Sequence, residues 1–493
     1  MRLSELLQAA GLPTDGAQEA AGVTGFAIDH RKVAPGTVFG AFRGAKFNGE
    51  DFITAAIEAG AIAVVAHPEA RVEGALHIAD VNPRRAFARL AAGFFAPVPE
   101  TIVAVTGTNG KTSCVEMTRQ IWRMGGERAA SIGTLGVTTP DGSVSTGLTT
   151  PDIVTFLANM SGLAREGVTH VAFEASSHGL SQYRNEGLHV TASAFTNFSR
   201  DHLDYHGTME DYFAAKMRLF TEVVGPGSPA VIHDAGDGSE WTAKAVAHAT
   251  ARGLDVRTVG EGGTYLRLVR REAGQLGQML TIEHDGAERK VNLPLIGAYQ
   301  AANALVAAAL TMATGVSASM VFDALTRLQP VRGRLERAAL NAAGAPAYVD
   351  YAHTPDALEA AMAALRPHVD GDGRLIVVFG AGGDRDAGKR PQMGEVAARM
   401  ADVVIVTDDN PRSEDAAAIR TAIIAGAGAD AREIGDRRAA IAAAIGEAGP
   451  RDIVLIAGKG HEQGQIFGSG ETMRIEAFDD VEVARECAGS AGR

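Results

Sequence analysis

The motif GTNGKT, residues 107–112, contains the residue types that bind nucleotide phosphates. Its glycines leave backbone N–H groups open to phosphate oxygens, Lys111 can contact the terminal phosphates, and the Thr112 hydroxyl can bind Mg²⁺. The motif is shorter than a Walker A motif, because Val105 stands where that motif has its first glycine. A glycine-rich turn without a ligand is the alternative. Strand, loop and helix nevertheless follow in the order that phosphate binding requires, so the sequence predicts a nucleotide site.

Carboxylates and imidazoles cluster in two later motifs, EASSHGL at residues 174–180 and NFSRDHLDYHG at residues 197–207. A hard cation bound to phosphates needs carboxylate oxygen and can accept an imidazole, although a histidine at a helix start is commonly a structural hydrogen-bonding group. Taken alone, Lys216 in the helical segment YFAAKMRLF is a solvated charge. The clustering favours Glu174 and His202 among the candidate ligands, which are Glu174, His178, Asp201, His202, Asp204 and His206.

A third group of polar residues follows the apolar run VVIV, in the segment VTDDNPRSED at residues 406–415. Pro411 fixes its own φ and restricts Asn410, so Arg412 starts from a constrained position at a strand end. A guanidinium there can pair with a carboxylate through two parallel N–H···O bonds. The alternative is a surface salt bridge with Glu414 or Asp415, worth at most about 1 kcal/mol.

Two further charged residues follow strands of the same region. Arg385 comes after LIVVFGAGGD and is a second candidate for a substrate carboxylate, with a loop salt bridge to Asp384 or Asp386 as its alternative. Glu462, in the motif GKGHE, can accept a hydrogen bond from an ammonium group. Both residues are therefore candidates for binding a charged small molecule.

Apolar runs followed by glycine-rich or polar loops recur along the chain, and helical segments separate them. This alternation predicts an α/β protein, and a length of 493 residues suggests about three domains. The proline-rich segment APVPE and a second boundary near LQPVRGRLE divide the chain. The expected domains are a smaller α/β domain at residues 1–97, a central P-loop-type α/β domain at residues 98–330 and a doubly wound, Rossmann-like domain at residues 331–493.

The net charge of -13 argues against nucleic acid as a partner, because such binding depends on many lysines and arginines. The two cysteines cannot form a disulfide framework, and no export signal is evident, so we expect a cytoplasmic protein. Residues 297–322 carry no formal charge, but six polar residues interrupt them, so we expect no membrane span.

The ordered motifs GTNGKT, EASSHGL, NFSRDHLDYHG, AAK, RGRLE and VDYAHTPD resemble the Mur ligase family, over nearly the whole chain. These are ATP-dependent, amide-forming ligases of bacterial wall-precursor synthesis. Within the family, GGDRDAGKRP, DDNPR and GKGHE are similar to the members that join a diamino acid to UDP-N-acetylmuramoyl-L-alanyl-D-glutamate. The resemblance implies that ATP converts the D-glutamyl γ-carboxylate into an acyl phosphate, which an amine then attacks.

The resemblance also implies roles for single residues. A pair of magnesium ions would be held by Thr112, Glu174, His202 and Lys216. Lys216 matches a lysine that is carbamylated (N6-carboxylysine) in such enzymes. Lys111, Glu174, His202 and Lys216 would be catalytic. ATP would contact Gly107, Thr108, Asn109, Gly110, Lys111, Thr112, Ser113, Asn303, Arg334, Asp350 and His353.

The muramoyl-dipeptide would be held by residues of the first two domains. The segment DHRKVAPGTVFGAFRG is similar to the family's uridine-binding segment, with His30 in place of the usual serine. The implied contacts are His30, Thr149, Thr150, Ser176, Gln182 and Arg184.

The resemblance implies that the amine donor is either meso-2,6-diaminopimelate or L-lysine, which differ by one distal carboxylate. The DDNPR motif favours diaminopimelate, with contacts from Arg385, Asp409, Asn410, Pro411, Arg412, Gly458 and Glu462. The rival interpretations are a lysine-adding relative, a folate-elongating ligase, and a P-loop regulatory ATPase that makes no covalent product. We expect a monomer.

Overall fold

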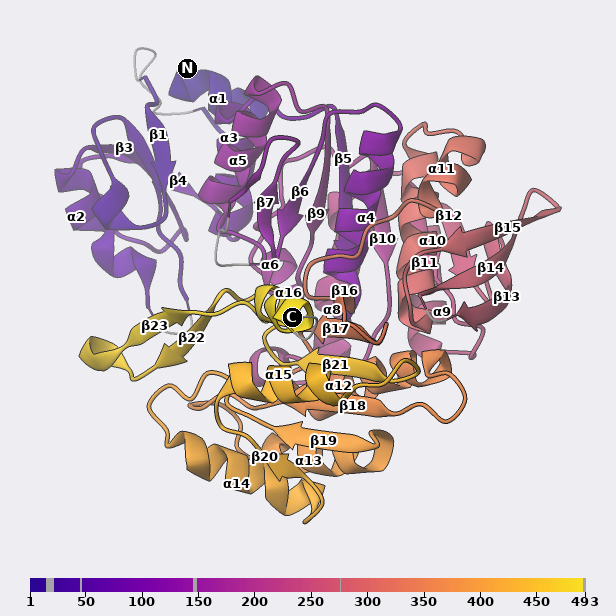
Figure 1. Cartoon of the computed structure of the whole chain (residues 1–493). Helices are drawn as coiled ribbons and strands as arrows, with labels where there is room; N and C mark the ends of the chain where they lie inside the picture. The colour runs from indigo at the N-terminus through magenta and orange to yellow at the C-terminus, as the bar shows by residue number, and fades with distance from the viewer. Residues whose placement is uncertain (15–21, 45–46, 145–148, 275, 491–493) are drawn as a thin grey trace. The chain divides into compact units, whose positions relative to one another are not determined.

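A computed structural model describes residues 1–14, 22–44, 47–144, 149–274 and 276–490. The chain forms two compact units, which are described separately (Figure 1). The first comprises Met1–Leu266 and Leu305–Val321, and the second comprises Arg267–Ala304 and Phe322–Arg493. Within the described part of the chain, no helix has the length and apolarity that a membrane crossing requires.

The N-terminal part of the first unit is a four-stranded parallel sheet with helices, of strand order β1-β2-β3-β4. Asn82 caps the third helix by accepting a hydrogen bond from the Arg85 N–H, and Pro83 occupies its first turn. The elements are α1 (Leu3–Ala9), β1 (Gly25–Ala27), η1 (His30–Lys32), β2 (Thr37–Gly40), η2 (Gly49–Phe52), α2 (Ile53–Glu58), β3 (Ala61–Ala66), β4 (Leu76–Ala79) and α3 (Pro83–Phe94).

In the central, 11-stranded sheet, the strands from β12 on belong to the first unit and follow the order β12-β11-β10-β5-β9-β6-β7-β8. The apolar strand β5 pairs in parallel with β10 on one side and β9 on the other. The chain leaves β5 toward β6 and later returns to β10, so β5 lies at a topological switch point, where ligands of such sheets bind. The strands of this part of the central sheet are β5 (Thr101–Thr106), β6 (Ala129–Gly133), β7 (Gly136–Thr138), β8 (Ser143–Val144), β9 (His170–Glu174), β10 (Ala192–Phe195), β11 (Pro229–His233) and β12 (Asp255–Gly260).

Helices connect these strands, and several begin at a capping side chain. Asp152 accepts hydrogen bonds from the Val154 and Thr155 N–H groups, and Thr208 accepts one from Asp211. The helices are α4 (Lys111–Met124), α5 (Ile153–Arg165), α6 (Ser177–Ser181), α7 (Leu203–His206), α8 (Met209–Arg218), the π-helical turn η3 (Leu219–Val223) and α9 (Glu240–Ala251).

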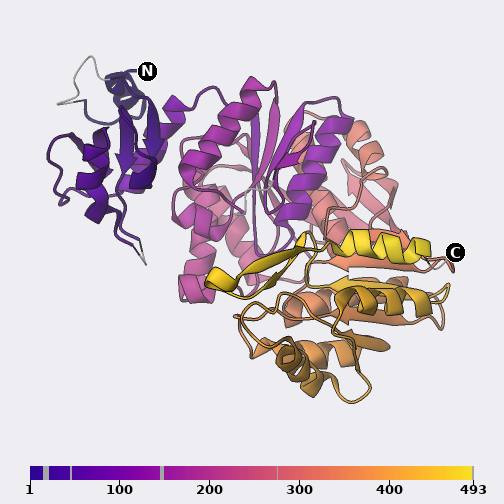
Figure 2. The ribbon, with the colours of Figure 1, turned by 60° about the vertical axis from the view of Figure 1, so that its left-hand side comes forward.

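The second unit contains a six-stranded sheet of order β16-β17-β21-β18-β19-β20 (Figure 2). Strands β17 to β20 in this order are parallel, and β16 is an antiparallel edge strand. Alternate residues of β18 pack against helices on opposite faces of the sheet. Val377 belongs to the apolar cluster that includes residues of α12, α13 and α14, and Ile376 belongs to the cluster that includes residues of α15 and α16. This confirms the predicted doubly wound sheet.

The strands of this sheet are β16 (Glu336–Leu340), β17 (Pro346–Asp350), β18 (Leu375–Phe379), β19 (Val403–Val406), β20 (Arg432–Glu433) and β21 (Ile453–Ala457). Its helices are α12 (Pro355–Leu365), η4 (Arg366–His368), α13 (Lys389–Met400), α14 (Ala416–Ala427), α15 (Arg437–Glu447) and α16 (Asp480–Ser490). Three successive antiparallel strands follow β12: β13 (Leu266–Gly274), β14 (Gly277–His284) and β15 (Ala287–Leu293). One antiparallel hairpin comprises β22 (Gly464–Phe467) and β23 (Arg474–Ala477), with η5 (Gly470–Thr472) between them. The residues of the remaining helices, α10 (Ala298–Ala313) and α11 (Ala318–Leu325), are divided between the two units.

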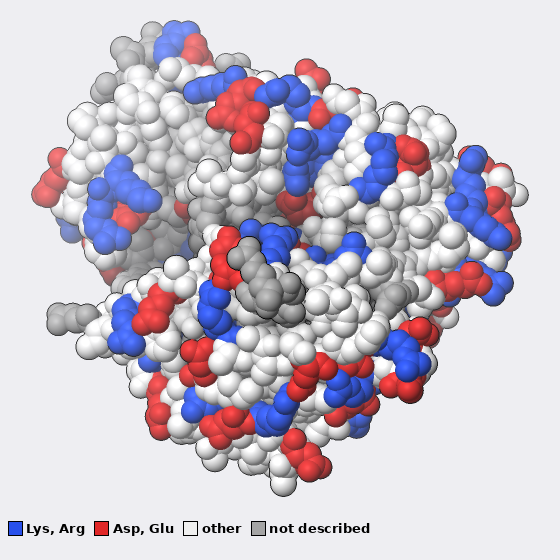
Figure 3. Space-filling model, viewed as in Figure 1, with Lys and Arg blue, Asp and Glu red and all other residues white. Residues whose placement is uncertain are grey.

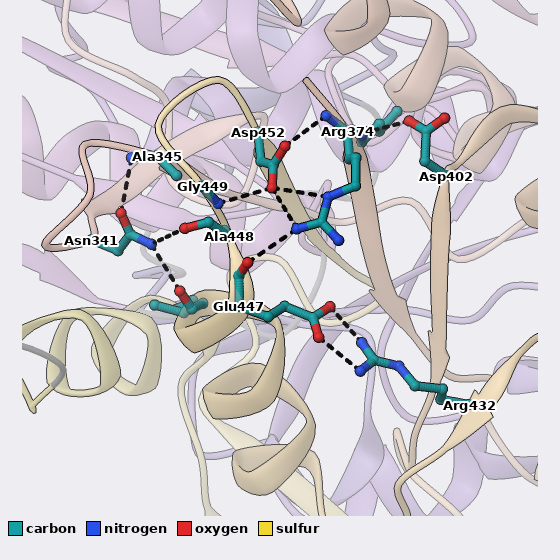
Figure 4. A network of polar contacts seen from close by, with 11 residues as sticks. Asn341, Ala345, Arg374, Asp402, Arg432, Glu447, Ala448, Gly449 and Asp452 are labelled. Carbon is teal, nitrogen blue, oxygen red and sulfur yellow. Dashed lines mark hydrogen bonds and ion pairs between the residues drawn. The ribbon is translucent and has the colours of Figure 1, made fainter. Parts of the chain in front are cut away.

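A polar network ties the amino ends of β18 and β21 together (Figure 4). The Asp452 carboxylate accepts hydrogen bonds from the Arg374 backbone N–H at 2.7 Å and from Arg374 Nη2 at 2.7 Å. Burial raises the pKa of Asp452, but the bonds from Arg374 outweigh it and hold the pKa below its ordinary value. This network lies opposite the carboxyl edge, where the candidate ligands are expected, so its role is structural.

A buried ion pair anchors α15 and α16. Arg437 Nε and Nη2 donate to the two oxygens of Asp480 at 2.7 and 2.6 Å, and both side chains are fully buried. Arg437 also donates to the carbonyls of Ala457 and Asp408, which end or follow β21 and β19. The pair therefore supports the backbone at the carboxyl edge of the sheet.

We expect Asp480→Ala to lower the free energy of unfolding by about 3–5 kcal/mol, because it leaves the Arg437 charge buried without its partner. Denaturant unfolding of the full chain, followed by circular dichroism, measures this loss. Asp372→Ala is the matched control, since Asp372 is 74% exposed and pairs with Arg451 at the surface. The control should change stability by less than about 1 kcal/mol. Equal effects of the two substitutions would contradict the assignment.

Charged side chains of both signs are interspersed on the face of the molecule seen in Figure 3. The net charge of -13 is therefore not gathered into one acidic patch on that face. A ligand that carries phosphates must instead meet local positive charge in its site.

Candidate active site

The predicted phosphate loop connects the end of β5 to the start of α4, as expected from the sequence. Gly107 has φ 143°, and a β-carbon there would lie 1.9 Å from Thr196 Oγ1. Gly110 has φ 84° and precedes α4 directly. The glycines are therefore required by the path of the backbone, and the loop leads to the amino end of a 14-residue helix, which favours anions.

The segment after β10 holds this loop in place. Thr196 Oγ1 donates to the Asn109 carbonyl at 2.6 Å, and Asn197 Oδ1 accepts a hydrogen bond from the Asn109 N–H at 2.9 Å. The Thr108 N–H donates to the Asn197 carbonyl at 2.9 Å. Sequence reasoning missed both supporting residues, although their position directly after an apolar strand was a usable signal.

Two lysines converge on the loop. Lys111 Nζ donates to the carbonyls of Gly107 and Thr108 at 3.0 and 2.8 Å, and Lys216 Nζ donates to Gly107 at 2.7 Å. Lys216 is only 1% exposed, so the interpretation of this residue alone as a solvated charge was wrong. Burial lowers the pKa of Lys216 well below its ordinary value, and the charge of Lys111 lowers it further. The charge of Asp201 opposes this shift, but the pKa of Lys216 still lies below its ordinary value.

Tyr212 joins the loop to Lys216 and was not predicted from the sequence. Its hydroxyl lies 3.3 Å from Thr108 Oγ1, and Lys216 Nζ lies 4.4 Å from the centre of its ring. Burial raises the pKa of Tyr212 to about 12. Its phenol is therefore neutral at physiological pH and can fix the loop as a hydrogen-bonding group.

Glu174 ends β9 and is 2% exposed. Its carboxylate accepts hydrogen bonds from the Thr134 N–H at 2.7 Å and the Thr134 hydroxyl at 3.3 Å. A β-carbon at Gly133 would lie 2.2 Å from Glu174 Oε1, so that glycine leaves room for the carboxylate. These contacts orient Glu174 while leaving oxygen lone pairs for another ligand.

His202 precedes α7 with φ 50°, and its Nε2 lies 3.3 Å from Asp201 Oδ2. Its ring packs against His178 and Tyr212, with centroid distances of 4.9 and 6.0 Å. His206 Nε2 lies 3.0 Å from the Ser177 hydroxyl. Among the described residues, no group of three or more His, Cys, Asp or Glu side chains is arranged to hold a metal ion.

The predicted dipeptide contacts of the central sheet form one hydrogen-bonded group. Thr150 Oγ1 lies 2.9 Å from Ser176 Oγ, and Thr149 Oγ1 lies 3.1 Å from Thr134 Oγ1. The Arg184 guanidinium donates to the Thr150 carbonyl and to Gln182 Oε1, both at 2.7 Å. Figure 1 allows the reader to follow this region around α6. The structure thus brings these residues together.

His30 begins η1 in the N-terminal part of the first unit. Its ring stacks on Phe52 with a centroid distance of 4.4 Å and an angle of 3° between the planes. Its Nδ1 lies 3.9 Å from Asp29 Oδ1. A planar, half-buried ring in this place presents a surface on which an aromatic base can stack.

In the second unit, the predicted adenosine contacts surround the end of β17. Asp350 accepts hydrogen bonds from the N–H groups of Leu335 and Ala352, although burial raises the pKa of Asp350. The Arg334 guanidinium lies 4.8 Å from the centre of the Tyr351 ring. Burial lowers the pKa of His353, which favours the neutral imidazole, and its Nδ1 lies 2.9 Å from the Tyr351 carbonyl oxygen. Asn303 lies on α10 of the same unit and donates to Gln300 Oε1 at 3.2 Å.

The DDNPR and GKGHE loops follow β19 and β21 at the same edge of this sheet. Asn410 is 3% exposed, and its Nδ2 donates to Glu462 Oε2 at 2.8 Å. Gly458 has φ 118°, and a β-carbon there would lie 2.5 Å from Asp409 Oδ2. The close approach of the two loops therefore requires glycine at position 458.

Arg412 has φ 52°, and its Nη1 donates to the Gly383 carbonyl at 2.8 Å. Among the described residues it forms no ion pair, and Glu414 pairs instead with Arg390 at 2.8 Å. The predicted alternative, a salt bridge from Arg412 to Glu414 or Asp415, is therefore wrong. Arg385 donates a hydrogen bond to the backbone carbonyl of Asp384. The side-chain carboxylate of Asp384 accepts one from the Ser413 hydroxyl.

Comparison with known proteins decides the family. Three family models match: Mur ligase family, catalytic domain, at residues 22–95; Mur ligase middle domain at residues 105–311; and Mur ligase, glutamate ligase domain, at residues 333–460. The chain belongs to the Mur ligase family. It is thus an ATP-dependent ligase with the three-domain α/β fold of that family.

The relatives of this Mur ligase include proteins of high sequence identity. It is 61% identical over 464 residues to UDP-N-acetylmuramoyl-L-alanyl-D-glutamate--2,6-diaminopimelate ligase of Zymomonas mobilis, covering 94% of each chain. It is 53% identical to the protein of that name in Bradyrhizobium diazoefficiens, covering 95% of each chain. A solved structure of a ligase with this name is 31% identical and matches with a TM-score of 0.76 over 100% of both chains.

Proposed function

We propose that the chain adds meso-2,6-diaminopimelate to the D-glutamyl γ-carboxylate of UDP-N-acetylmuramoyl-L-alanyl-D-glutamate, in the synthesis of peptidoglycan precursors for the cell wall. The position of Arg412 is the observation that supports diaminopimelate as the added amino acid. Its guanidinium is held at the carboxyl edge of the sheet without an ion pair among the described residues, and Asn410 links the same loop to Glu462. An arginine for a carboxylate and a glutamate for an ammonium complement the distal end of diaminopimelate.

The reaction needs ATP because a carboxylate oxygen is a poor leaving group. The γ-carboxylate oxygen attacks the γ-phosphorus of ATP, ADP leaves, and an acyl phosphate forms. The amine of the second amino acid attacks its carbonyl carbon, and phosphate leaves as the amine loses a proton. Lys111 and the backbone N–H groups of residues 107–110 would stabilise the charge on the transferred phosphoryl group.

The residues beside the loop suit Mg²⁺. Glu174, the Thr112 hydroxyl, His202 and a carbamylated Lys216 would supply mainly oxygen ligands, which a hard cation prefers. A magnesium ion bound there would neutralise charge on the phosphates. The chain's own contribution is to orient Glu174 through Thr134 and to keep Lys216 buried.

Three further properties belong to the proposal. The domains extend over residues 1–97, 98–330 and 331–493, with the contacts to the uridine end, ATP and diaminopimelate in that order. The protein is a cytoplasmic monomer. Its partners are ATP, the UDP-muramoyl-dipeptide and diaminopimelate, and nucleic acid is not one of them.

One assay separates this function from its rivals. Phosphate release from ATP is measured with diaminopimelate, L-lysine or L-glutamate, each with and without the UDP-muramoyl-dipeptide. The proposal requires release that depends on both the dipeptide and diaminopimelate. Preference for L-lysine would indicate the lysine-adding relative, and release independent of all three amino acids would indicate a regulatory ATPase.

Arg412→Ala tests the assignment of the distal carboxylate. We expect the KM for diaminopimelate to rise about 100-fold or more, because a buried charge pair loses one partner. The substitution keeps a β-carbon at φ 52°, so backbone strain does not change. The KM values for ATP and the UDP-muramoyl-dipeptide should stay near those of the wild type. Arg399→Ala, at a 59% exposed site, is the control; a normal KM in Arg412→Ala would refute the role.

A further inference from the structure

Lys459 lies between the two loops that carry the diaminopimelate contacts and has no role in the function proposed so far. Its side chain is fully buried, its Nζ donates to Asn410 Oδ1 at 2.8 Å and lies 3.5 Å from Glu462 Oε2. We propose that Lys459 is a positioning residue that fixes the Asn410 carboxamide and the Glu462 carboxylate, and thereby sets selectivity for an amino acid with a distal carboxylate. This inference rests on the proposed function.

The donors around Asn410 determine which way its carboxamide points. Lys459 Nζ and the Ile466 N–H, at 2.8 and 3.0 Å, can only donate, so both must face the carboxamide oxygen. The two lone pairs of Oδ1 are then used. The Nδ2 group must therefore face Glu462, to which it donates at 2.8 Å. One Nδ2 hydrogen has no further acceptor among the described residues and can be offered to a substrate carboxylate.

The opposite orientation of the Asn410 carboxamide would be unfavourable for both its oxygen and its nitrogen. Oδ1 would face the Glu462 carboxylate, which has no proton to donate, and Nδ2 would face two donors. The substrate carboxylate would then lose its hydrogen bond from Asn410. Lys459 thus favours the orientation that suits a carboxylate and an ammonium on one carbon atom, which diaminopimelate has at its distal end and L-lysine lacks.

Burial of the Lys459 ammonium group costs free energy unless its contacts with Asn410 and Glu462 are kept. Burial lowers the pKa of Lys459, and Arg437 lowers it further, while Asp409, Glu462 and Asp480 raise it. A buried ammonium group is retained at low cost only where acceptors surround it. Asn410 and Glu462 are the acceptors that the structure provides within hydrogen-bonding or ion-pair distance.

Two substitutions separate hydrogen bonding from packing. Lys459→Met keeps the apolar stem and removes the donor, whereas Lys459→Gln keeps a donor without the charge. We expect Lys459→Met to raise the KM for diaminopimelate about 10- to 100-fold. We expect kcat and the KM values for ATP and the UDP-muramoyl-dipeptide to change less than about threefold. The selectivity for diaminopimelate over L-lysine, as a ratio of kcat/KM, should fall in parallel, and Lys459→Gln should recover part of both losses.

A double substitution tests whether Lys459 acts through Asn410. If it does, Lys459→Met combined with Asn410→Leu should raise the diaminopimelate KM no more than Asn410→Leu alone. Additive effects, or a uniform loss of kcat with every substrate KM unchanged, would overturn the proposal and indicate a structural lysine. Lys290→Met, on the exposed part of β15, is the matched control. Wild-type enzyme without diaminopimelate-dependent phosphate release would refute the proposed function itself, which the other outcomes leave intact.

Discussion

Replacing Lys111 by methionine is expected to lower kcat about 1000-fold or more. Lys111 begins α4, and its ammonium group turns back over the loop to the carbonyls of Gly107 and Thr108. Under the proposed mechanism, a cation at this place would stabilise the charge that moves between the leaving ADP and the acyl phosphate, and loss of such a cation or donor typically costs 10²- to 10⁵-fold. Phosphate release with saturating substrates measures kcat.

The matched control for Lys111 is Lys244→Met. Lys244 lies on α9 of the same unit, is 43% exposed and pairs with Glu240 at 2.6 Å. It should keep wild-type kcat, because an exposed helix ion pair contributes only about 0.3–0.5 kcal/mol. A Lys111→Met enzyme that retains a tenth of the wild-type kcat and an unchanged thermal unfolding curve would exclude Lys111 from the phosphoryl transfer.

Local patterns were sufficient to predict much of the fold. The apolar run at residues 101–106 forms β5, and the helix expected after the glycine-rich loop is α4, which begins at Lys111. Runs such as VVIV and IVLIA form parallel strands of the second unit. These predictions succeed because strand burial, helix capping and glycine-dependent turns leave their signals within a few residues.

Contacts between distant segments were not predictable in the same way. Thr196 and Asn197 support the phosphate loop from about 90 residues away, because the switch-point topology places β10 beside β5. The burial of Lys216 depends on Tyr212 and the loop, neither of which its own helix pattern reveals. The GKGHE motif alone does not indicate that Lys459 contacts Asn410, which lies 49 positions away in the sequence.

Removal of carbon dioxide is expected to lower activity through the loss of carbamylation at Lys216. Carbamylation joins a neutral amine to CO₂ and releases one proton, so it requires an unprotonated Nζ. Burial, with the charge of Lys111, holds the pKa of Lys216 well below its ordinary value, which raises the fraction of unprotonated amine at a given pH. Because the reaction releases a proton, acidification should favour the free amine and then its protonated form. We therefore expect activity to fall when CO₂ is removed at mildly acidic pH and to return when bicarbonate is added at neutral pH.

Lys216→Met should lower kcat about 100-fold or more, because the proposed magnesium site would lose its anionic ligand, and bicarbonate should not restore it. An NMR carbonyl signal from isotope-labelled CO₂ should be present in the wild type and absent in Lys216→Met. The exposed Lys290→Met variant should keep both the signal and the response to bicarbonate. Full wild-type activity after CO₂ removal, together with no labelled signal, would show that the buried amine of Lys216 acts without carbamylation. Its low pKa would then serve to limit positive charge beside Lys111, since two ammonium groups at the Gly107 carbonyl repel each other.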